Sequence, residues 1–330
     1  MTQIDLSQYP APAVLEELEY EAVYAEIKEH FLNQFPDDEQ TATKRGLPSR
    51  GNIELLLQIE GNLIVKSLQA YAYHAIQMRA RVNDAAKASM LAYATESDLD
   101  NLAAFYMVSR KEGEDDEDLR ARLILAVDGF STAGPSGAYK FHGLSAADEV
   151  KDVSVDAPRF SVATVAPEIM AMLPPQSIVL QVDYDAGLSN PKPGDVAITV
   201  LSAGGAGSPS ADTLDKVEVA LNDEDVRPIS DNPRIRAAEI EEYAIHARLW
   251  FYGNVDTEVV RLAADSAVRE YADAVHRLGY DVTVSGLHRA LHQPGVQRVE
   301  LLNPTASIER GNNEAAFCNS ITVETGGIDV

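Results

Sequence analysis

The stretch DGFSTAGPSGAYKFH, from Asp128 to His142, contains three glycines and a proline between two segments whose apolar residues follow helical spacing. Glycine adopts backbone conformations that other residues avoid, and proline is favoured in the first turn of a helix. We therefore expect a sharp corner between two helices, in which the glycines permit the turn and Pro135 begins the second helix. The residues of this corner motif are Gly129, Phe130, Ser131, Thr132, Gly134, Pro135 and Gly137.

Two chemical alternatives for the corner fit the sequence poorly. In the G-x-S-x-G elbow of serine hydrolases the nucleophile follows a strand, whereas Ser131 follows the helical segment LRARLILAV, and Ala133 replaces the second glycine. A Walker loop requires a lysine directly after its last glycine, and neither Gly134 nor Gly137 is followed by one. The corner is therefore expected to be structural.

The overall charge limits the kinds of partner. The 330 residues include 27 Lys and Arg against 52 Asp and Glu, which gives a formal net charge of -25. Nucleic acids and anionic membrane surfaces recruit proteins through Lys and Arg, so we expect no nucleic acid and no membrane among the partners. Such a charge keeps a protein in solution until a specific surface overcomes the repulsion, which suits a subunit of a larger assembly.

Other bulk features indicate a globular protein made in a cytoplasm. Hydrophobic residues make up 45% of the chain and charged residues 24%, close to the globular average. No apolar run approaches the roughly 18 residues of a membrane span, and the start MTQIDLSQYPAPAV lacks the basic and apolar segments of a secretory signal. Cys318 is the single cysteine, which excludes an intrachain disulfide; we expect it to be a small buried apolar residue.

The N-terminal region is predicted to be helical. An amphipathic helix is expected from Pro12 to about Phe35, followed by an exposed loop from Pro36 to Gly51 and a longer helix from Asn52 towards Tyr93. Two long helices without an obvious core need each other or another chain to cover their apolar faces. The expected partner-contact residues on the first helix are Leu15, Leu18, Ala22 and Ala25.

Shorter elements follow this region. Thr95 is expected to cap a helix that includes Leu99 to Met107, and the acidic run from Glu112 to Asp118 is expected to stabilise the start of the next helix rather than form a calcium loop. The remaining predicted elements are strands at Val150–Pro158, Ser177–Tyr184, Asp195–Ser202 and Arg234–Tyr252 and helices at Ala211–Asn222 and Asp256–Arg277.

This mixture favours the α+β class, with a helical N-terminal region followed by mixed α/β sandwich-like domains. The spacing V-x-x-V-x-V-x-x-P at Val150 recurs as V-x-x-V-x-L-x-x-P at Val296, and a Ser-Gly pair precedes each. This similarity suggests two related α-α-β-β units, from about Asp116 to Ser202 and from about Asp256 to Thr325. The expected domains are residues 1–95, residues 96–240 with an insertion at about 159–194, and residues 241–330.

Two further patterns are weak candidates for binding sites. The loop AGGAGSPS, Ala203–Ser210, begins like a dinucleotide loop, but Pro209 lacks a donor and Ser210 replaces the third glycine, so we expect a turn with Ser210 capping the next helix. His288 and His292 have the spacing of two metal ligands, without the Glu of H-E-x-x-H or an evident third ligand. We predict no catalytic residue, cofactor site or metal site.

Several segments, taken together, resemble the baseplate J-like proteins of contractile-tailed bacteriophages and related contractile particles. They occur in the family's order along most of the chain, and they are specific as a set. The segments are IDLSQYPAPAVLEELEYEAV (Ile4–Val23), SDLDNLAA (Ser97–Ala104), EDLRARLILAVDGFSTAGPSGAYKFHGLSA (Glu117–Ala146) with VKDVSVDAP after it, DVAITVLS, EDVRPISD (Glu224–Asp231), and HRLGYDV followed by LHQPGVQRVELLNP.

The resemblance implies a non-enzymatic structural subunit of a baseplate wedge, made in the bacterial host cytoplasm and assembled into a ring around the tail tube. The implied partners are other wedge proteins, the sheath-initiating component and further copies of the chain, with no cofactor. Rearrangement of that ring helps to trigger sheath contraction. Many family members have only a short turn where this chain has Arg159 to Gly194, so we expect an insertion there.

Two other function classes remain as hypotheses. One is a soluble enzyme with an acidic cleft, such as a glycoside hydrolase that uses two carboxylates. Some carboxylates will lie close together in so acidic a chain, but their abundance nominates no general acid and base, and an aromatic content of 7% argues against sugar stacking. The other is a secreted adhesive module, which the missing signal sequence disfavours.

Overall fold

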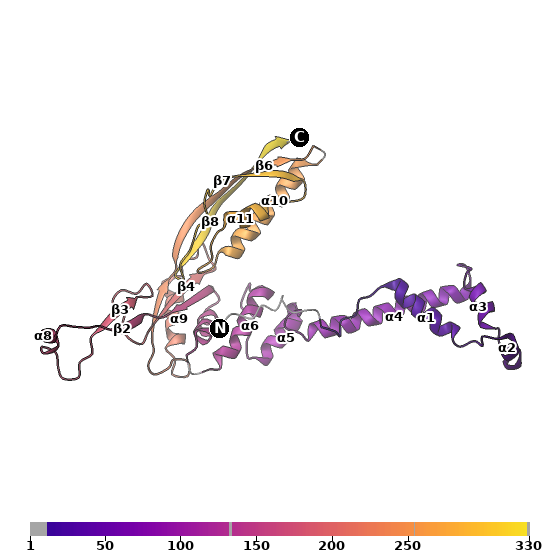
Figure 1. The fold of residues 1–330 in the computed structure, drawn as a ribbon, viewed down its shortest axis with the longest axis horizontal. Coiled ribbons are helices and arrows are strands. Elements are labelled where there is room, and N and C mark those ends of the chain that lie inside the picture. Colours follow the sequence, from indigo (N-terminus) through magenta and orange to yellow (C-terminus); the bar gives the residue numbers. More distant parts are fainter. Residues whose placement is uncertain (1–11, 132–133, 254, 329–330) are drawn as a thin grey trace. The chain divides into compact units, whose positions relative to one another are not determined.

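The computed structural model describes residues 12–131, 134–253 and 255–328. It has the predicted α+β fold, with a helical N-terminal region followed by mixed helices and strands, as Figure 1 shows. The chain divides into two compact units. The first unit comprises Met1–Arg110 and Glu114–Arg120, and the second comprises Lys111–Gly113 and Ala121–Val330. The domain boundaries predicted at residues 95 and 240 fall inside these units and stay predictions.

The first helix, α1 (Tyr20–Leu32), begins at Tyr20 and not at Pro12, so the predicted start is wrong. The reason lies in the hydrogen bonds of the preceding segment. The backbone N–H of Glu16 donates to Oδ1 of Asn83 at 3.1 Å, and the backbone oxygen of Glu16 accepts from Nδ2 of Asn83 at 2.8 Å. Because a distant side chain binds both backbone groups, this segment does not enter the helix.

The predicted loop from Pro36 to Gly51 contains a short helix, α2 (Glu39–Arg45), and the start of α3 (Arg50–Leu56). Asp38 caps α2 by accepting from the backbone N–H of Thr41 at 2.8 Å. The long helix predicted after residue 52 is also interrupted, because α4 (Leu63–Ala88) begins anew after Asn62. The Asn62 side chain accepts from the N–H of Ile64 at 2.9 Å, which supplies the second start signal.

These helices share a small core. Helix α1 runs beside α4 in the first unit (Figure 1). Arg79 on α4 donates to Glu26 on α1 at 2.9 Å, so an exposed ion pair accompanies the apolar contact. The buried core residues are Leu32, Ile53, Leu57, Val65 and Leu68. The two helices therefore cover one another on one side, as the sequence allowed.

Helix α5 (Glu96–Phe105) begins after Thr95, but the Thr95 side chain makes no capping hydrogen bond. The carboxylate of Asp116 accepts from the backbone N–H of Glu96 at 3.0 Å instead, and it also binds Arg110 at 2.7 Å. Both bonds lower the pKa of the Asp116 carboxyl group, and the bond from the Glu96 N–H has the larger effect. Asp116 is also the first residue of α6 (Asp116–Gly129), so the acidic run begins this helix as predicted.

A three-stranded sheet forms the core of the central region. Its order is β1 (Val150–Asp156), β4 (Asp195–Ser202) and β5 (Asn232–Ala237), with β1 antiparallel and β5 parallel to β4. Helices α7 (Ser136–Ser145) and α9 (Ala211–Leu221) pack against it. Their shared core consists of Tyr139, Ala147, Val150, Val153, Ile198, Val200, Val217 and Leu221.

The expected insertion forms a two-stranded antiparallel ribbon. Its strands are β2 (Arg159–Val162) and β3 (Leu180–Tyr184), where the sequence predicted only one strand. The short helix α8 (Pro167–Met170) lies in the connection between them. Figure 1 shows α8 at the end of the ribbon that is farthest from β4.

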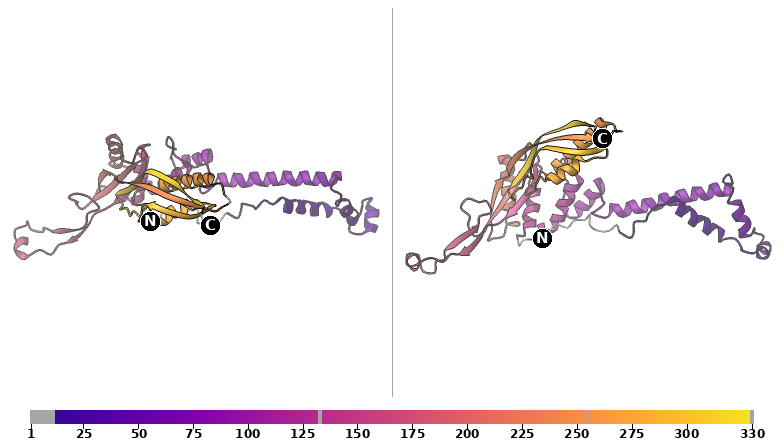
Figure 2. Two further views of the ribbon diagram at one scale, coloured as in Figure 1. Left: turned by 90° about the horizontal axis from the view of Figure 1, so that it is seen from above. Right: turned by 45° about the horizontal axis from the view of Figure 1, so that its top comes forward.

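The C-terminal region is a second three-stranded sheet with helices on one face (Figure 2). Strand β6 (Glu239–Phe251) lies between β7 (Val296–Asn303), which is antiparallel to it, and β8 (Glu314–Ile328), which is parallel to it. Helices α10 (Thr257–Val275) and α11 (Val284–Leu291) cover the inner face. The inner residues include Ile245, Ala247, Leu249, Phe251, Val268, Leu287 and Leu291.

The two proposed α-α-β-β units share their first three elements. In each unit a long helix, a shorter helix and a strand follow in order, as α6-α7-β1 and as α10-α11-β7. In each, the glycine of the Ser-Gly pair lies against the preceding helix, because a Cβ on Gly137 would meet Asp128 and one on Gly286 would meet Tyr271. The strand pairing differs, since β1 pairs with β4 whereas β6 separates β7 from β8.

Candidate assembly surfaces

The described residues of the corner motif make close contacts at the end of α6 and the start of α7. A Cβ on Gly129 would lie 2.3 Å from the Phe141 ring, and one on Gly137 would lie 1.9 Å from the Asp128 carboxylate. Gly134 has φ of 70°, in the left-handed region that favours glycine. Pro135 is the N-cap residue of α7 and has extended backbone geometry, so the helix begins at Ser136 and the start predicted at Pro135 is one residue too early.

The other described residues in and beside the corner motif make structural contacts. Ser131 donates its backbone N–H to Asp128 at 3.0 Å, in the turn that ends α6, and Phe130 is exposed. His142 lies 3.1 Å from the backbone oxygen of Gly129 through Nε2, so a structural bond occupies that nitrogen. Thr132 lies outside the described residues. The arrangement is that of a packed corner.

The residues predicted to contact a partner are not the residues of α1 that pack against the core of the first unit. Ala22 and Ala25 are exposed on α1, and Leu15 and Leu18 are half-buried residues that precede the helix. The residues of α1 that pack inward are Val23, Tyr24, Ile27, Phe31 and Leu32. A contact of the four predicted residues with another chain stays a prediction.

Helix α4 carries apolar side chains on its buried side and also on its exposed surface. With roughly 100° of rotation per residue, the buried residues Val65, Leu68 and Ala72 fall on one side and face the core of the first unit. Large exposed side chains on the rest of the helix include Leu63, opposite the buried side, and Tyr71, Met78 and Val82, which lie within roughly 40° of one another and about 90° from the buried side. We call these four residues the α4 outer face. Large apolar faces of this kind are typical of helices that bind a partner.

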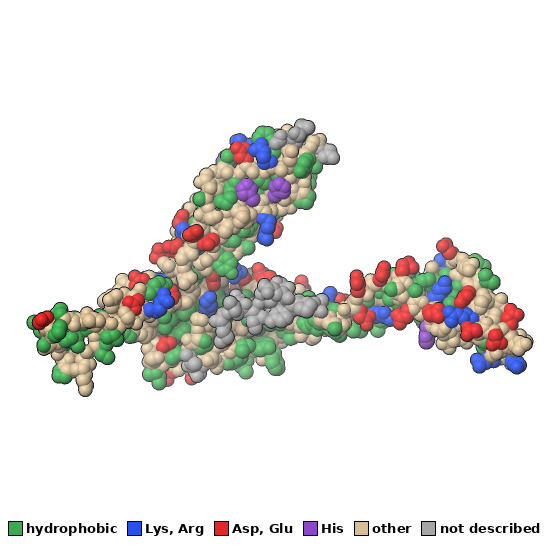
Figure 3. All heavy atoms as spheres, viewed as in Figure 1, with side chains coloured by type: hydrophobic (Ala, Val, Ile, Leu, Met, Phe, Trp, Pro, Cys, Tyr) green, Lys and Arg blue, Asp and Glu red, His purple; other side chains and the backbone are tan. Residues whose placement is uncertain are grey.

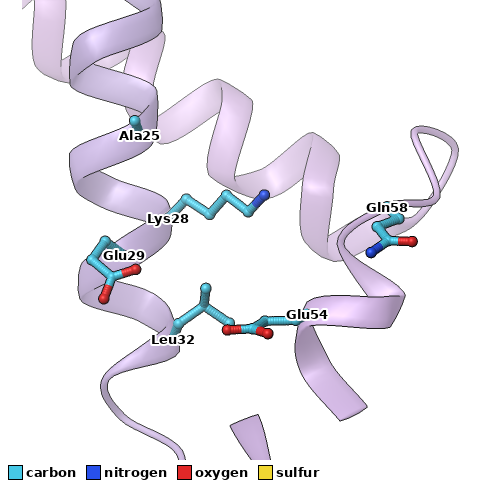
Figure 4. Close-up of a pocket in the computed structure, with 6 residues that line it drawn as sticks. All are labelled: Ala25, Lys28, Glu29, Leu32, Glu54 and Gln58. Carbon is cyan, nitrogen blue, oxygen red and sulfur yellow. The ribbon is translucent and has the colours of Figure 1, made fainter. Parts of the chain in front are cut away.

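A hollow of about 410 Å³ lies between α1 and α3, and Figure 4 shows the residues that line it. Glu29 and Glu54 are its two carboxylates. Both accept from Arg50, at 2.9 and 3.1 Å, so neither stands as a free acid or base. The remaining lining residues are Ala25, Lys28, Leu32 and Gln58. This geometry gives the glycoside hydrolase hypothesis no support.

The outer face of the C-terminal sheet combines aromatic and charged side chains. Trp250 on β6 stacks with the guanidinium of Arg298 on β7, whose Cζ lies 4.7 Å from the ring centroid. Glu324 on β8 binds Nε2 of His246 at 3.0 Å and the guanidinium of Arg248 at 3.4 Å. Both contacts lower the pKa of the Glu324 carboxyl group, and the contact with His246 has the larger effect. Paired Trp and Arg side chains on an open sheet face are typical of interface anchors.

The remaining site predictions concern metals, membranes and the single cysteine. His288 lies in α11, and His292 is the C-cap residue of that helix. The described part of the chain contains no cluster of three or more His, Cys, Asp or Glu residues suited to a metal ion. Within the described residues, no helix combines the length and hydropathy of a membrane span. Cys318 is half-buried at the edge of the C-terminal core, so its predicted full burial is wrong, because it lies at the irregularity of strand β8 beside the exposed residue Asn319.

Comparison with known proteins identifies the family. The family model described as the baseplate J-like N-terminal domain matches residues 60–114, and the C-terminal domain model matches residues 243–324. Baseplate protein J of Escherichia phage P2 is 37% identical over 344 residues, an alignment that covers 100% of both chains. This chain belongs to the baseplate J-like family. Membership gives it a structural role in a tail baseplate and confirms the resemblance seen in the sequence.

The matched domains contain both surfaces described above. The α4 outer face lies within residues 60–114, and Trp250 and its neighbours lie within residues 243–324. A chain of the anti-feeding prophage baseplate, determined by cryo-EM with six-fold symmetrisation, has a TM-score of 0.34 and 16% identity. That match covers 57% of this chain and 36% of the other, and at this TM-score it carries no structural argument.

Proposed function

We propose that this protein is a structural subunit of a baseplate wedge in a contractile tail, present in repeated copies that form a ring around the tail tube. The observation that carries the proposal is the identity of 37% to baseplate protein J of phage P2 along the whole of both chains. A relationship that spans the entire length supports a shared role for the whole molecule rather than for one domain.

The surfaces of the two units support a role in assembly. Leu63 on the α4 outer face is 81% exposed, and Trp250 and Arg298 form a stacked pair on an open sheet face. Large apolar and aromatic side chains of this kind stabilise protein interfaces when a partner removes them from water. The partners we propose are other wedge proteins, the sheath-initiating component and further copies of this chain.

We also propose that the protein takes part in the rearrangement that triggers sheath contraction. Its division into two compact units supports this step, because one unit can keep its contacts while the other exchanges partners. The role we infer is non-enzymatic. Synthesis is proposed in the bacterial host cytoplasm, with the finished protein residing in the tail baseplate of the particle.

Coexpression with the other proteins of the same tail gene cluster tests this function. The wild-type chain is expected to copurify in a complex of fixed composition. Met78→Glu with Val82→Glu places charges on the α4 outer face and should abolish or weaken that complex, whereas Gln77→Glu, an exposed neighbour on the same helix, should leave it unchanged. If the wild-type chain forms no complex although every component folds, the proposal is wrong.

A further inference from the structure

The ribbon formed by β2 and β3 is amphipathic, although the strands form a sheet of only two. The register pairs Phe160 with Val182 and Val162 with Leu180, and it pairs Ser161 with Gln181 between them. Because side chains alternate along a strand, the first two pairs share one face and the third lies on the opposite face. One face of the ribbon is therefore apolar and the other polar.

The apolar face lies open to solvent. Val162 is 71% exposed, and Ile178, which precedes β3, is 70% exposed. Leu180 and Val182 are exposed as well and Phe160 is half-buried, so most of this face is open. The connection between the strands adds a second group of exposed apolar side chains, visible in Figure 3 as green spheres around α8: Ile169, Met170, Met172 and Leu173.

The base of the ribbon is firmly held, in contrast to its open apolar face. The hydroxyl of Tyr184 on β3 donates to Asp156 on β1, and the guanidinium of Arg159 stacks 4.9 Å from the Tyr184 ring centroid. Arg236 on β5 binds the backbone oxygen of Ala186 at 2.9 Å. A ribbon fixed at its base presents its apolar face in one arrangement, which lowers the entropy lost on docking.

The charge of the ribbon selects among partners. From Phe160 to Pro191 the sequence contains no Lys, Arg or His, and its ionisable acids are Glu168, Asp183 and Asp185. Asp183 accepts from Ser161 at 2.9 Å on the polar face, so this charge lies across the ribbon from the apolar face. Arg159, which begins β2, is the one basic residue from Arg159 to Pro191 and stacks on Tyr184, so the ribbon carries a net negative charge.

We propose that the apolar face of the β2–β3 ribbon docks into an apolar groove, bordered by Lys or Arg side chains, on a different protein of the same baseplate. This inference rests on the proposed function. A second copy of the ribbon is the wrong partner for this face, because both ribbons carry a net negative charge. An anionic lipid surface would be repelled in the same way.

Site-specific photo-crosslinking in assembled particles tests the partner directly. The photoreactive residue p-benzoylphenylalanine replaces Leu180 on the apolar face, and in a matched control it replaces Gln181, the next residue on the polar face. Position 180 should crosslink to a Lys- or Arg-bordered groove of another baseplate protein, identified by mass spectrometry, and position 181 should give much less product.

Three results would overturn the inference. They are crosslinks from position 180 to a second copy of the chain, crosslinks to lipid, and assembled baseplates that contain the chain but yield no crosslink from position 180. The last result leaves the wedge function standing. Absence of the chain from the particles would overturn the wedge function together with the inference.

Substitutions measure the contribution of the apolar face. The Kd is measured between this chain and the purified partner protein that crosslinking identifies. Ile178→Gln and Leu180→Gln should each raise this Kd about tenfold, since each replaces an apolar contact by a polar one. Gln181→Ala should leave it unchanged. These side chains are exposed, so the variants should fold normally by circular dichroism. Equal Kd values for all three variants would contradict the proposed docking face.

Discussion

Asp195, the first residue of β4, is a buried carboxylate with three partners. It accepts from Asn232 at 2.7 Å, from the backbone N–H of Lys192 at 2.9 Å and from Arg234 at 3.1 Å. Burial alone would raise its pKa, but these donors outweigh burial and hold the pKa below its usual value. The charge of Asp195 therefore stabilises the junction of β4 and β5.

Asp195→Asn should lower the free energy of unfolding by about 2 kcal/mol at pH 7, because a charged acceptor is lost from buried hydrogen bonds. A lowered folded-state pKa gives stability that is present above the unfolded pKa of about 4 and is lost as the pH falls through the folded value. The difference between variant and wild type, measured by urea denaturation, should therefore shrink below pH 4. A difference that stays constant down to pH 2 would contradict this assignment.

His276 should make stability sensitive to mild acid. Its Nδ1 donates to the Ala316 oxygen at 2.8 Å, and burial, with Lys151 nearby, lowers its pKa despite the opposing effects of this bond and of Asp273. The neutral ring is thus favoured in the folded state. Stability is complete above the unfolded pKa of about 6.5 and falls as the pH drops from there through the folded value.

Thermal unfolding between pH 7 and pH 5 measures this effect. The wild-type protein should lose more stability over this range than His276→Asn, whose side-chain amide can replace the Nδ1 donor without taking up a proton. An equal loss in the two proteins would show that His276 is not the responsible group.

At the scale of elements, the sequence predicts helices and strands whose signals are local. The acidic start of α6 and the β-branched run of β4 lie within the elements they define, and Asp256, the N-cap of α10, directly precedes its helix. The predicted helix starts and strand order fail where residues far apart in the sequence determine the structure. The bonds between Asn83 and Glu16 delay α1, and β6 enters the sheet between β7 and β8, which no local pattern reveals.

The candidate surfaces show the same limit. The apolar spacing of α1 and α4 indicated that partners must cover them, but it could not show which face α1 and α4 use for each other. The exposed face predicted on α1 consists of small alanines, whereas the large exposed side chains are on α4. The insertion was inferred from the family resemblance, since many members have only a short turn there, and its two-stranded pairing follows from contacts beyond the span of a local pattern.

The contact between α10 and α11 gives a prediction at the element scale. A Cβ on Gly286 would lie 2.3 Å from the Tyr271 hydroxyl, which accepts from the N–H of Thr283 at 3.1 Å and cannot move without loss of that bond. Gly286→Ala should therefore lower the free energy of unfolding by about 1 to 3 kcal/mol. Gly51→Ala, at a helical glycine with open space around it, is the control and should not destabilise the protein. Equal stability of both variants would contradict the tight contact.

At the scale of the whole molecule, the two units predict separable folding and assembly. Deleting Met1 to Asp84 removes α1, α2, α3 and nearly all of α4, but it keeps the bonds of Arg120 to Leu91 and Ala94, each 2.7 Å. The second unit has cores of its own, so the truncated chain should fold with the strand content of the parent. It should fail to assemble, as native-gel analysis of coexpressed tail proteins would show. Retained assembly would mean that the N-terminal helices serve only internal packing.

The wedge role is tested most directly by the mass of the protein in solution. Size exclusion coupled to light scattering gives that mass for the purified chain alone and after mixing with the other proteins of its tail gene cluster. A hetero-complex of defined mass is the result that the wedge role predicts. A chain that keeps the same mass in every mixture, with all components folded, would contradict it.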